Sequence, residues 1–199
     1  MILRFLRLID KWKPASPPFA LTIGPTDSEG DGGPGGATGD SGFTDVYRDH
    51  LDRVYAYIRY RVASTQEAED LTGDVFEAAF RQFHEFDSQR ASHLTWLLGI
   101  ARNRLSSHYR RQRLRGFFKL SEDIVHDTDL EGDAVEHAEV LEVRRLLRGL
   151  PDRDREIIAL KFGAGLNNRE ISRMIGISES NVGTLLYRAV GRLRKEMQE

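Results

Sequence analysis

The sequence predicts an all-α protein made of two small helical domains joined by an acidic linker. Two observations lead to this fold class. Only one of the six prolines and ten of the eighteen glycines lie in residues 43–199, so most of that stretch can be helical. Within it, apolar residues recur at the three- and four-residue spacing of helices. With 199 residues, 40% of them hydrophobic, the chain is long enough to bury two small cores.

The first 42 residues have a different composition. Five prolines and eight glycines crowd residues 14–42, and such a segment cannot bury enough apolar surface to offset its chain entropy. The thirteen residues ahead of it carry three cations on one helical face, which fits either a short surface-docking helix or a frayed terminus. We therefore expect residues 1–42 to form a flexible N-terminal extension.

Three helices are expected in residues 43–113. The first carries a helical stripe of apolar residues over 43–62. Ser64 and Glu67 form a capping-box pair that opens the second helix. The apolar stripe of this second helix includes three aromatic rings that we expect in the core: Phe76, Phe80 and Phe83. The third helix begins near Ser92 and continues into a block of arginines, so three amphipathic helices can close a small bundle.

Charge is divided into blocks along this part of the chain. Residues 65–89 carry a net charge of −6 and residues 121–142 carry −9, whereas residues 101–120 carry +7. The formal charge of −2 for the whole chain is therefore a sum over opposed surfaces, and it does not exclude nucleic acid as a partner. The basic block lies beside Trp96 and Tyr109, a mixture that suits unpaired nucleic acid, because bases stack on rings while arginines follow the backbone. A solvated basic helix end is the alternative.

The last part of the chain predicts short helices separated by turns. Pro151 begins one helix, and Asn167 with Glu170 caps the next. Gly176 ends that helix, and Ser178 caps the last one. This order is typical of a helix-turn-helix, with a plain helical hairpin as the alternative. Its second helix would enter the DNA major groove with four polar side chains near bases or phosphates: Ser180, Asn181, Thr184 and Arg188.

Three segments resemble the extracytoplasmic-function (ECF) sigma factors of bacterial RNA polymerase: Ala68–Phe80, Thr95–Asn103 and Leu150–Arg194. The resemblance covers about residues 43–113 and 140–196, in the order found in that family. It implies four parts: the extension at 1–42, sigma region 2 at 43–113, an acidic linker at 114–140, and sigma region 4 at 141–199. In the family, the linker threads through polymerase channels that later hold template DNA and RNA.

The resemblance also implies roles for individual residues. In the family, the acidic second helix docks on the clamp of the polymerase β′ subunit, and here the matching residues are Asp70, Leu71, Asp74 and Phe76. The next helix opens and reads the −10 promoter element, and its matching residues are Trp96, Arg102, Asn103, Arg110 and Arg111. The helix-turn-helix reads the −35 element beside the β flap. The implied function is promoter-specific initiation in the cytoplasm, commonly restrained by an anti-sigma factor.

A freestanding regulator that binds DNA through the same helix-turn-helix is the alternative function. The acidic helix and the basic helix over 96–113 distinguish the two, since a simple repressor needs neither. An enzyme is not expected, because the six histidines have no metal-ligand spacing and no nucleophile or phosphate-binding motif is present. The sequence therefore predicts no cofactor, no metal and no small-molecule substrate. The chain has no cysteine, which excludes disulfides and thiolate chemistry.

Overall fold

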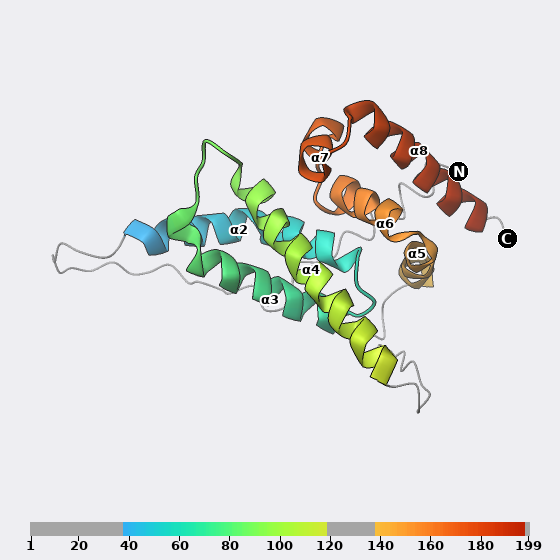
Figure 1. Ribbon diagram of the computed structural model, residues 1–199, viewed down its shortest axis with the longest axis horizontal. Coiled ribbons are helices and arrows are strands. Elements are labelled where there is room, and N and C mark those ends of the chain that lie inside the picture. Colours follow the sequence, from blue (N-terminus) through green and yellow to red (C-terminus); the bar gives the residue numbers. More distant parts are fainter. Residues whose placement is uncertain (1–37, 119–137, 198–199) are drawn as a thin grey trace.

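The computed structural model describes residues 38–118 and 138–197, and these two segments are helical without any strand (Figure 1). The all-α fold class is confirmed. The elements in chain order are α2 (Thr38–Arg59), α3 (Thr65–Arg81), the 3-10 turn η1 (Phe83–Glu85), α4 (His93–Phe118), α5 (Ala138–Gly149), α6 (Asp152–Ile158), the π-helical turn η2 (Ala159–Gly163), α7 (Asn168–Ile175) and α8 (Glu179–Glu196).

Helices α2, α3 and α4 form a small bundle in which α4 crosses the other two (Figure 1). Each helix turns its apolar stripe inward, as the periodicity predicted. The largest contributions come from fully buried aliphatic side chains: Val54 and Ile58 of α2, Val75 of α3, and Leu97, Leu98 and Leu105 of α4. Burial of such side chains contributes about 1.5–3 kcal/mol each, so this core is the main support of α4.

Local capping sets where the helices begin. The Glu67 amide donates to Ser64 Oγ at 3.0 Å, and the Ser64 amide donates back to Glu67 Oε2 at 3.4 Å, which confirms the predicted capping box of α3. Asn167 and Glu170 form the same reciprocal pair at the start of α7, at 2.9 and 2.7 Å. Each box satisfies amide groups that the first helical turn leaves without partners.

The predicted helix-turn-helix is present as α7 and α8. Gly176 ends α7 with a left-handed φ of 72°, a conformation that glycine adopts without a Cβ penalty. Ser178 then accepts a hydrogen bond from the Asn181 amide at 3.2 Å and caps α8. The inward face of α8 carries three fully buried residues, Val182, Ala189 and Leu193.

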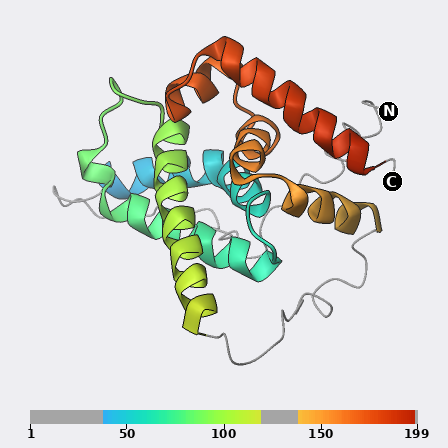
Figure 2. The same cartoon turned by 45° about the vertical axis from the view of Figure 1, so that its right-hand side comes forward.

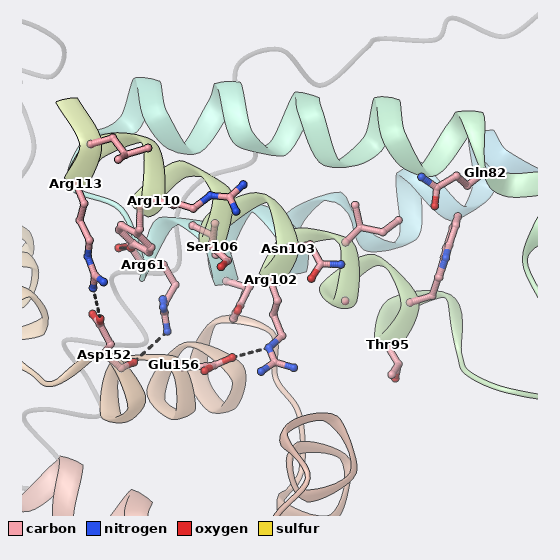
Figure 3. Close-up of a pocket in the computed structure, with 17 residues that line it drawn as sticks. Arg61, Gln82, Thr95, Arg102, Asn103, Ser106, Arg110, Arg113, Asp152 and Glu156 are labelled. Carbon is pink, nitrogen blue, oxygen red and sulfur yellow. Dashed lines mark hydrogen bonds and ion pairs between the residues drawn. The ribbon is translucent and has the colours of Figure 1, made fainter.

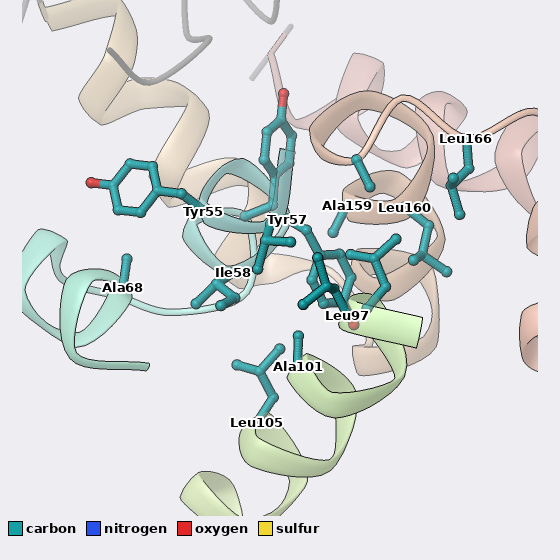
Figure 4. Packing of buried hydrophobic residues seen from close by; sticks show 14 of the residues in the cluster. Tyr55, Tyr57, Ile58, Ala68, Leu97, Ala101, Leu105, Ala159, Leu160 and Leu166 are labelled. Atoms are coloured by element: carbon teal, nitrogen blue, oxygen red, sulfur yellow. The ribbon is translucent and has the colours of Figure 1, made fainter. Parts of the chain in front are cut away.

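The two halves of the chain share one apolar core, which the sequence did not predict. Figure 2 shows α6 and η2 lying between α2 and α8. In Figure 4, Ala159 and Leu160 of η2 pack beside Tyr57 and Ile58 of α2, and Leu97 of α4 completes the cluster. Region 43–113 and the C-terminal helices are therefore packed against each other.

Three sequence-based expectations differ from the structure. Helix α2 begins at Thr38, inside the expected extension. Helix α4 extends to Phe118 and helix α5 begins at Ala138, so both enter the expected linker at 114–140. The prediction that Phe80 lies in the core is wrong: it is 53% exposed at the edge of the bundle, where Phe43 covers one side of it. Residues 1–37 and the rest of the acidic linker lie outside the described residues.

Candidate nucleic-acid interface

A cleft of about 1130 Å³ runs along α4, and α6 forms part of its opposite wall (Figure 3). The cleft brings together four of the five α4 residues that were expected to contact −10 DNA: Trp96, Arg102, Asn103 and Arg110. The fifth, Arg111, lines a smaller hollow of about 200 Å³ beside Asp70 and Asp74 of α3. The structure therefore gives α4 two different surfaces, one facing the cleft and one facing α3.

Two acidic residues of α6 face the basic side of this cleft. Arg102 donates from Nε to Glu156 Oε1 at 2.6 Å, and from Nη1 to the carbonyl oxygen of Met174 at 3.0 Å. Arg113 Nη2 lies 3.7 Å from Asp152 Oδ2, and Arg61 Nη1 donates to the Asp152 carbonyl at 3.1 Å. By contrast, Asn103 and Arg110 are exposed. Part of the cleft is thus neutralised within the chain and part is open to a ligand.

Three flat rings lie together where α4 begins. Phe86 stacks on His93 with centroids 4.2 Å apart and lies 5.1 Å from the Trp96 ring. All three side chains are half-buried, so part of each remains accessible for stacking with a base. Sequence reasoning named Trp96 and missed Phe86 and His93. Phe86 and His93 lie on either side of the loop that leads into α4, and this placement in the sequence could have indicated that they lie near Trp96.

The wall of the cleft contains neutral hydroxyl groups. Burial raises the pKa of Tyr57 above its usual range, because a buried site disfavours the charged phenolate. The Tyr109 hydroxyl donates to the carbonyl of Arg61, whose guanidinium lies 5.9 Å from the Tyr109 ring centroid. The positive charge that the cleft offers to nucleic acid therefore comes from its arginines.

The four residues predicted to bind core polymerase divide into two pairs. Asp70 and Asp74 are exposed on α3, and exposed Glu77 continues the same acidic stripe. Leu71 and Phe76 are buried, and the Phe76 ring packs edge-on against another ring of the bundle at 4.8 Å. Only the carboxylates are therefore available to a partner, while the two apolar residues fix α3 in the bundle.

The four residues predicted to read the −35 element, Ser180, Asn181, Thr184 and Arg188, are all exposed on α8. The Thr184 hydroxyl donates to the Ser180 carbonyl at 3.1 Å, so this hydroxyl is bonded within α8. Tyr187 is 82% exposed beside them and was missed. Its spacing of three residues from Thr184, on the same side of the helix, was the signal that could have found it.

The part of the chain that the structure describes contains neither a metal-ligand cluster nor a membrane-spanning helix. Among residues 38–118 and 138–197, no three histidine, aspartate or glutamate side chains are grouped so that they could hold a metal ion. In the same part of the chain, no helix is long and apolar enough to span a membrane.

A helix-turn-helix joined to a basic, ring-lined cleft on a second helical bundle defines a DNA-binding protein of the sigma-70 class. Residues 46–115 match the family model for sigma-70 region 2, and residues 141–193 match that for sigma-70 region 4. The chain is 32% identical over 160 residues to the ECF RNA polymerase sigma factor SigX of Bacillus subtilis, covering 77% of this chain and 82% of SigX. It belongs to the family of ECF RNA polymerase sigma factors.

Two other known proteins share this similarity. The ECF sigma factor BldN of Streptomyces coelicolor is 34% identical over 162 residues, which make up 77% of this chain but 59% of BldN, so the chain spans less than two thirds of that relative. A co-crystal structure is known of the sigma factor RpoE with the anti-sigma factor NepR from Bartonella quintana. This RpoE superposes on the chain with a TM-score of 0.66 and is 20% identical to it in sequence. The superposition covers 79% of this chain and 98% of that one. The superposition supports the fold.

Proposed function

We propose that this chain binds the core of bacterial RNA polymerase and directs it to specific promoters, reading a −10 and a −35 element and helping to open the −10 duplex. Residues 43–113 act as region 2, residues 141–199 as region 4, and residues 114–140 as the linker between them. The observation that carries the proposal is the combination of an exposed acidic stripe on α3 with an arginine-lined cleft along α4 and an exposed polar face on α8.

Helix α3 supplies the contact with polymerase in this proposal. Asp70 and Asp74 present exposed carboxylates on α3, beside the hollow that Arg111 of α4 also lines. A basic partner surface, such as the β′ clamp that the family binds, would complement this stripe. Leu71 and Phe76 act from inside the bundle by holding the stripe in a fixed position.

Helix α4 captures the separated −10 strand. Asn103 can hydrogen-bond a base edge, Arg110 can follow the phosphates, and Trp96 offers a ring face next to Phe86. Removing a base from the duplex stack costs a few kcal/mol, and stacking recovers about 1–3 kcal/mol for each captured base. A cleft that combines exposed polar groups with rings is therefore suited to strand opening.

Helix α8 lies in the major groove of the −35 element in this proposal. Asn181 and Arg188 can pair with base edges or phosphates, and the Thr184 methyl group and Tyr187 add apolar contact. The adjoining β flap of polymerase would hold region 4 over this site.

The remaining properties follow from this role. The chain acts in the cytoplasm, where polymerase works, and it performs no catalysis of its own, since the polymerase core carries the reaction. An anti-sigma factor is proposed as a further partner, because the similar fold of RpoE was captured bound to one.

A gel-shift comparison separates this function from that of a freestanding regulator. A pool of promoter fragments is incubated with the chain alone, with core polymerase alone, and with both. We expect weak, non-specific binding by the chain alone and sequence-specific, heparin-resistant complexes only with both proteins. Tight and specific binding by the chain alone, unchanged by core polymerase, would favour the regulator instead.

A further inference from the structure

Arg111 lies apart from the other α4 residues that were expected to contact −10 DNA. The cleft along α4 is lined by Arg102, Asn103 and Arg110, whereas Arg111 lines the hollow of about 200 Å³ beside α3. Successive residues of a helix point about 100° apart. This rotation carries Arg111 from the cleft side of α4 to the side where α4 crosses α3 (Figure 1). Arg111 therefore belongs to a different surface from the residues of the cleft.

The hollow has an apolar floor and a rim that carries both charges. Leu71 of α3, which is 4% exposed, forms the floor. The exposed carboxylates of Asp70 and Asp74 lie on the α3 side, and the exposed guanidinium of Arg111 lies on the α4 side. The volume equals that of about six or seven molecules of liquid water. The hollow therefore has room for one long side chain of a partner but not for a helix or a strand.

Glu67 joins the two walls of the hollow. Its Oε2 accepts hydrogen bonds from the amides of Ala63 and Ser64 at 3.2 and 3.4 Å, at the start of α3. Its Oε1 accepts a hydrogen bond from Gln112 Nε2 of α4 at 3.2 Å and lies 3.5 Å from His108 Nε2. The distance between the walls is thus set within the free chain, and a preorganised surface loses little conformational freedom on binding.

The charges around the rim do not neutralise one another. Within residues 38–118 and 138–197, no carboxylate lies within 4 Å of the Arg111 guanidinium. Asp70 accepts a hydrogen bond from a neutral group, the Gln66 amide, at 3.0 Å. By contrast, Arg102 and Arg113 on the cleft side of α4 both have carboxylates of α6 within 4 Å. The rim therefore presents separate negative and positive charges to a partner.

We propose that this hollow is part of the surface that docks on polymerase, and that Arg111 orients the docking and does not bind −10 DNA. The hollow receives one arginine or lysine side chain of the polymerase clamp. The aliphatic stem of that side chain packs on Leu71, and its cation binds the carboxylates of Asp70 and Asp74. A neighbouring carboxylate of the clamp pairs with Arg111. The inference rests on the proposed docking of polymerase on α3.

Opposite charges on the two sides of the hollow give the docking a direction. An acidic stripe alone attracts a basic surface in either direction along α3. With Arg111 on the α4 side, a partner turned end for end would bring like charges together and lose affinity. Asp70 and Asp74 thus supply attraction, and Arg111 selects one orientation.

Two neighbouring charge reversals test the assignment of Arg111. Arg111→Glu and Arg110→Glu make the same change on adjacent exposed residues, so the effect of net charge is equal in both. Because the chain has no cysteine, a dye on Lys195→Cys reports binding of the full chain to core polymerase by fluorescence anisotropy. A labelled single strand of mixed sequence, about 20 nucleotides long, reports binding of the unlabelled chain to nucleic acid.

The two variants should have opposite effects. We expect Arg111→Glu to weaken polymerase binding about tenfold and strand binding by about twofold at most. Arg110→Glu should weaken strand binding about tenfold and polymerase binding by about twofold at most. Arg48→Glu on α2 is the control for both measurements and should change neither, because its side chain is 64% exposed and its ion pair with Asp45 is also exposed.

A charge exchange across the hollow tests the direction of docking. Asp74→Arg combined with Arg111→Asp leaves the net charge unchanged but reverses the rim. We expect this double variant to bind polymerase no better than Asp74→Arg alone. Attraction by net charge alone would instead restore the affinity of the unaltered chain. Circular dichroism verifies the helix content, and Arg111→Gln takes the place of Arg111→Glu if that variant has lost helix.

Three results would overturn the role of Arg111. These are polymerase binding by Arg111→Glu no weaker than by Arg48→Glu, a loss of strand binding equal to that of Arg110→Glu, and restored affinity in the exchange variant. If Asp74→Arg also left polymerase binding unchanged, the docking of polymerase on α3, on which the inference rests, would be overturned instead.

Discussion

Replacing Arg192 by Met should destabilise the C-terminal half more than replacing its partner Asp154 by Asn. Arg192 of α8 donates to the carboxylate of Asp154 in the first turn of α6. The Asp154 side chain is only 8% exposed, whereas that of Arg192 is 54% exposed. Removing the arginine strands a desolvated carboxylate, but removing the carboxylate leaves an arginine that can extend into water.

The expected magnitudes follow from this asymmetry. Breaking a fully buried ion pair costs about 3–5 kcal/mol, and breaking an exposed pair costs about 0–1 kcal/mol. Since one partner is buried and the other is half exposed, we expect a loss of about 2 kcal/mol in the free energy of unfolding for Arg192→Met. For Asp154→Asn we expect about 1 kcal/mol, part of it from the favourable position of the carboxylate at a helix N-terminus.

Urea unfolding of the full chain, followed by far-ultraviolet circular dichroism, measures these losses. Arg188→Met is the matched control, because it makes the same change on the exposed side of α8 and should cost less than about 0.5 kcal/mol. Equal losses for the two partners, or a larger loss for Asp154→Asn, would refute the reasoning that burial of the carboxylate decides the outcome.

Three further predictions concern binding, strand opening and pH. Asp70→Arg should weaken capture of the chain by β′ clamp fragments about tenfold, because it reverses an exposed charge on α3. The control Asp45→Arg reverses an exposed charge on α2 and should leave capture unchanged. Equal weakening of capture by the two variants would count against docking by α3. Asn103→Ala should reduce permanganate reactivity of −10 thymines more than gel-shift affinity for the promoter, and parallel losses would contradict its role in opening. Burial, together with the nearby charge of Arg53, lowers the pKa of His50 below its ordinary value of 6.5. The folded state therefore favours neutral histidine, and the stability of the fold decreases as the pH falls through and below 6.5. His50→Gln should flatten the decline in the urea midpoint between about pH 7.5 and 5.5, and an unaltered decline would show that other groups cause it.

Much of the local structure could be predicted because its causes are local. Ser64 with Glu67 and Asn167 with Glu170 begin their helices through contacts three residues apart, which a sequence displays directly. The break at Gly176 and the buried face of α8 follow from single residues and from helical periodicity. The exposed acids of α3 and polar residues of α8 could be located for the same reason.

What the sequence did not reveal depends on contacts between distant segments. Arg102 and Glu156 are separated by 54 positions, and nothing in the local pattern of either one indicates the other. The close approach of Gly163 to the backbone of Tyr57 becomes evident only in three dimensions. Periodicity likewise places Phe80 on the apolar side of α3 but does not show that the bundle ends before covering it. The roles proposed for individual polymerase- and DNA-binding residues remain predictions.

The central claim, that the chain directs polymerase to specific promoters, is tested most directly by transcription in vitro. Core polymerase is incubated with a library of promoter fragments, with and without the chain, and the transcript starts are mapped. We expect new starts only when the chain is present, each preceded by two shared elements about 25 base pairs apart. No transcription above that of core polymerase alone would contradict the account.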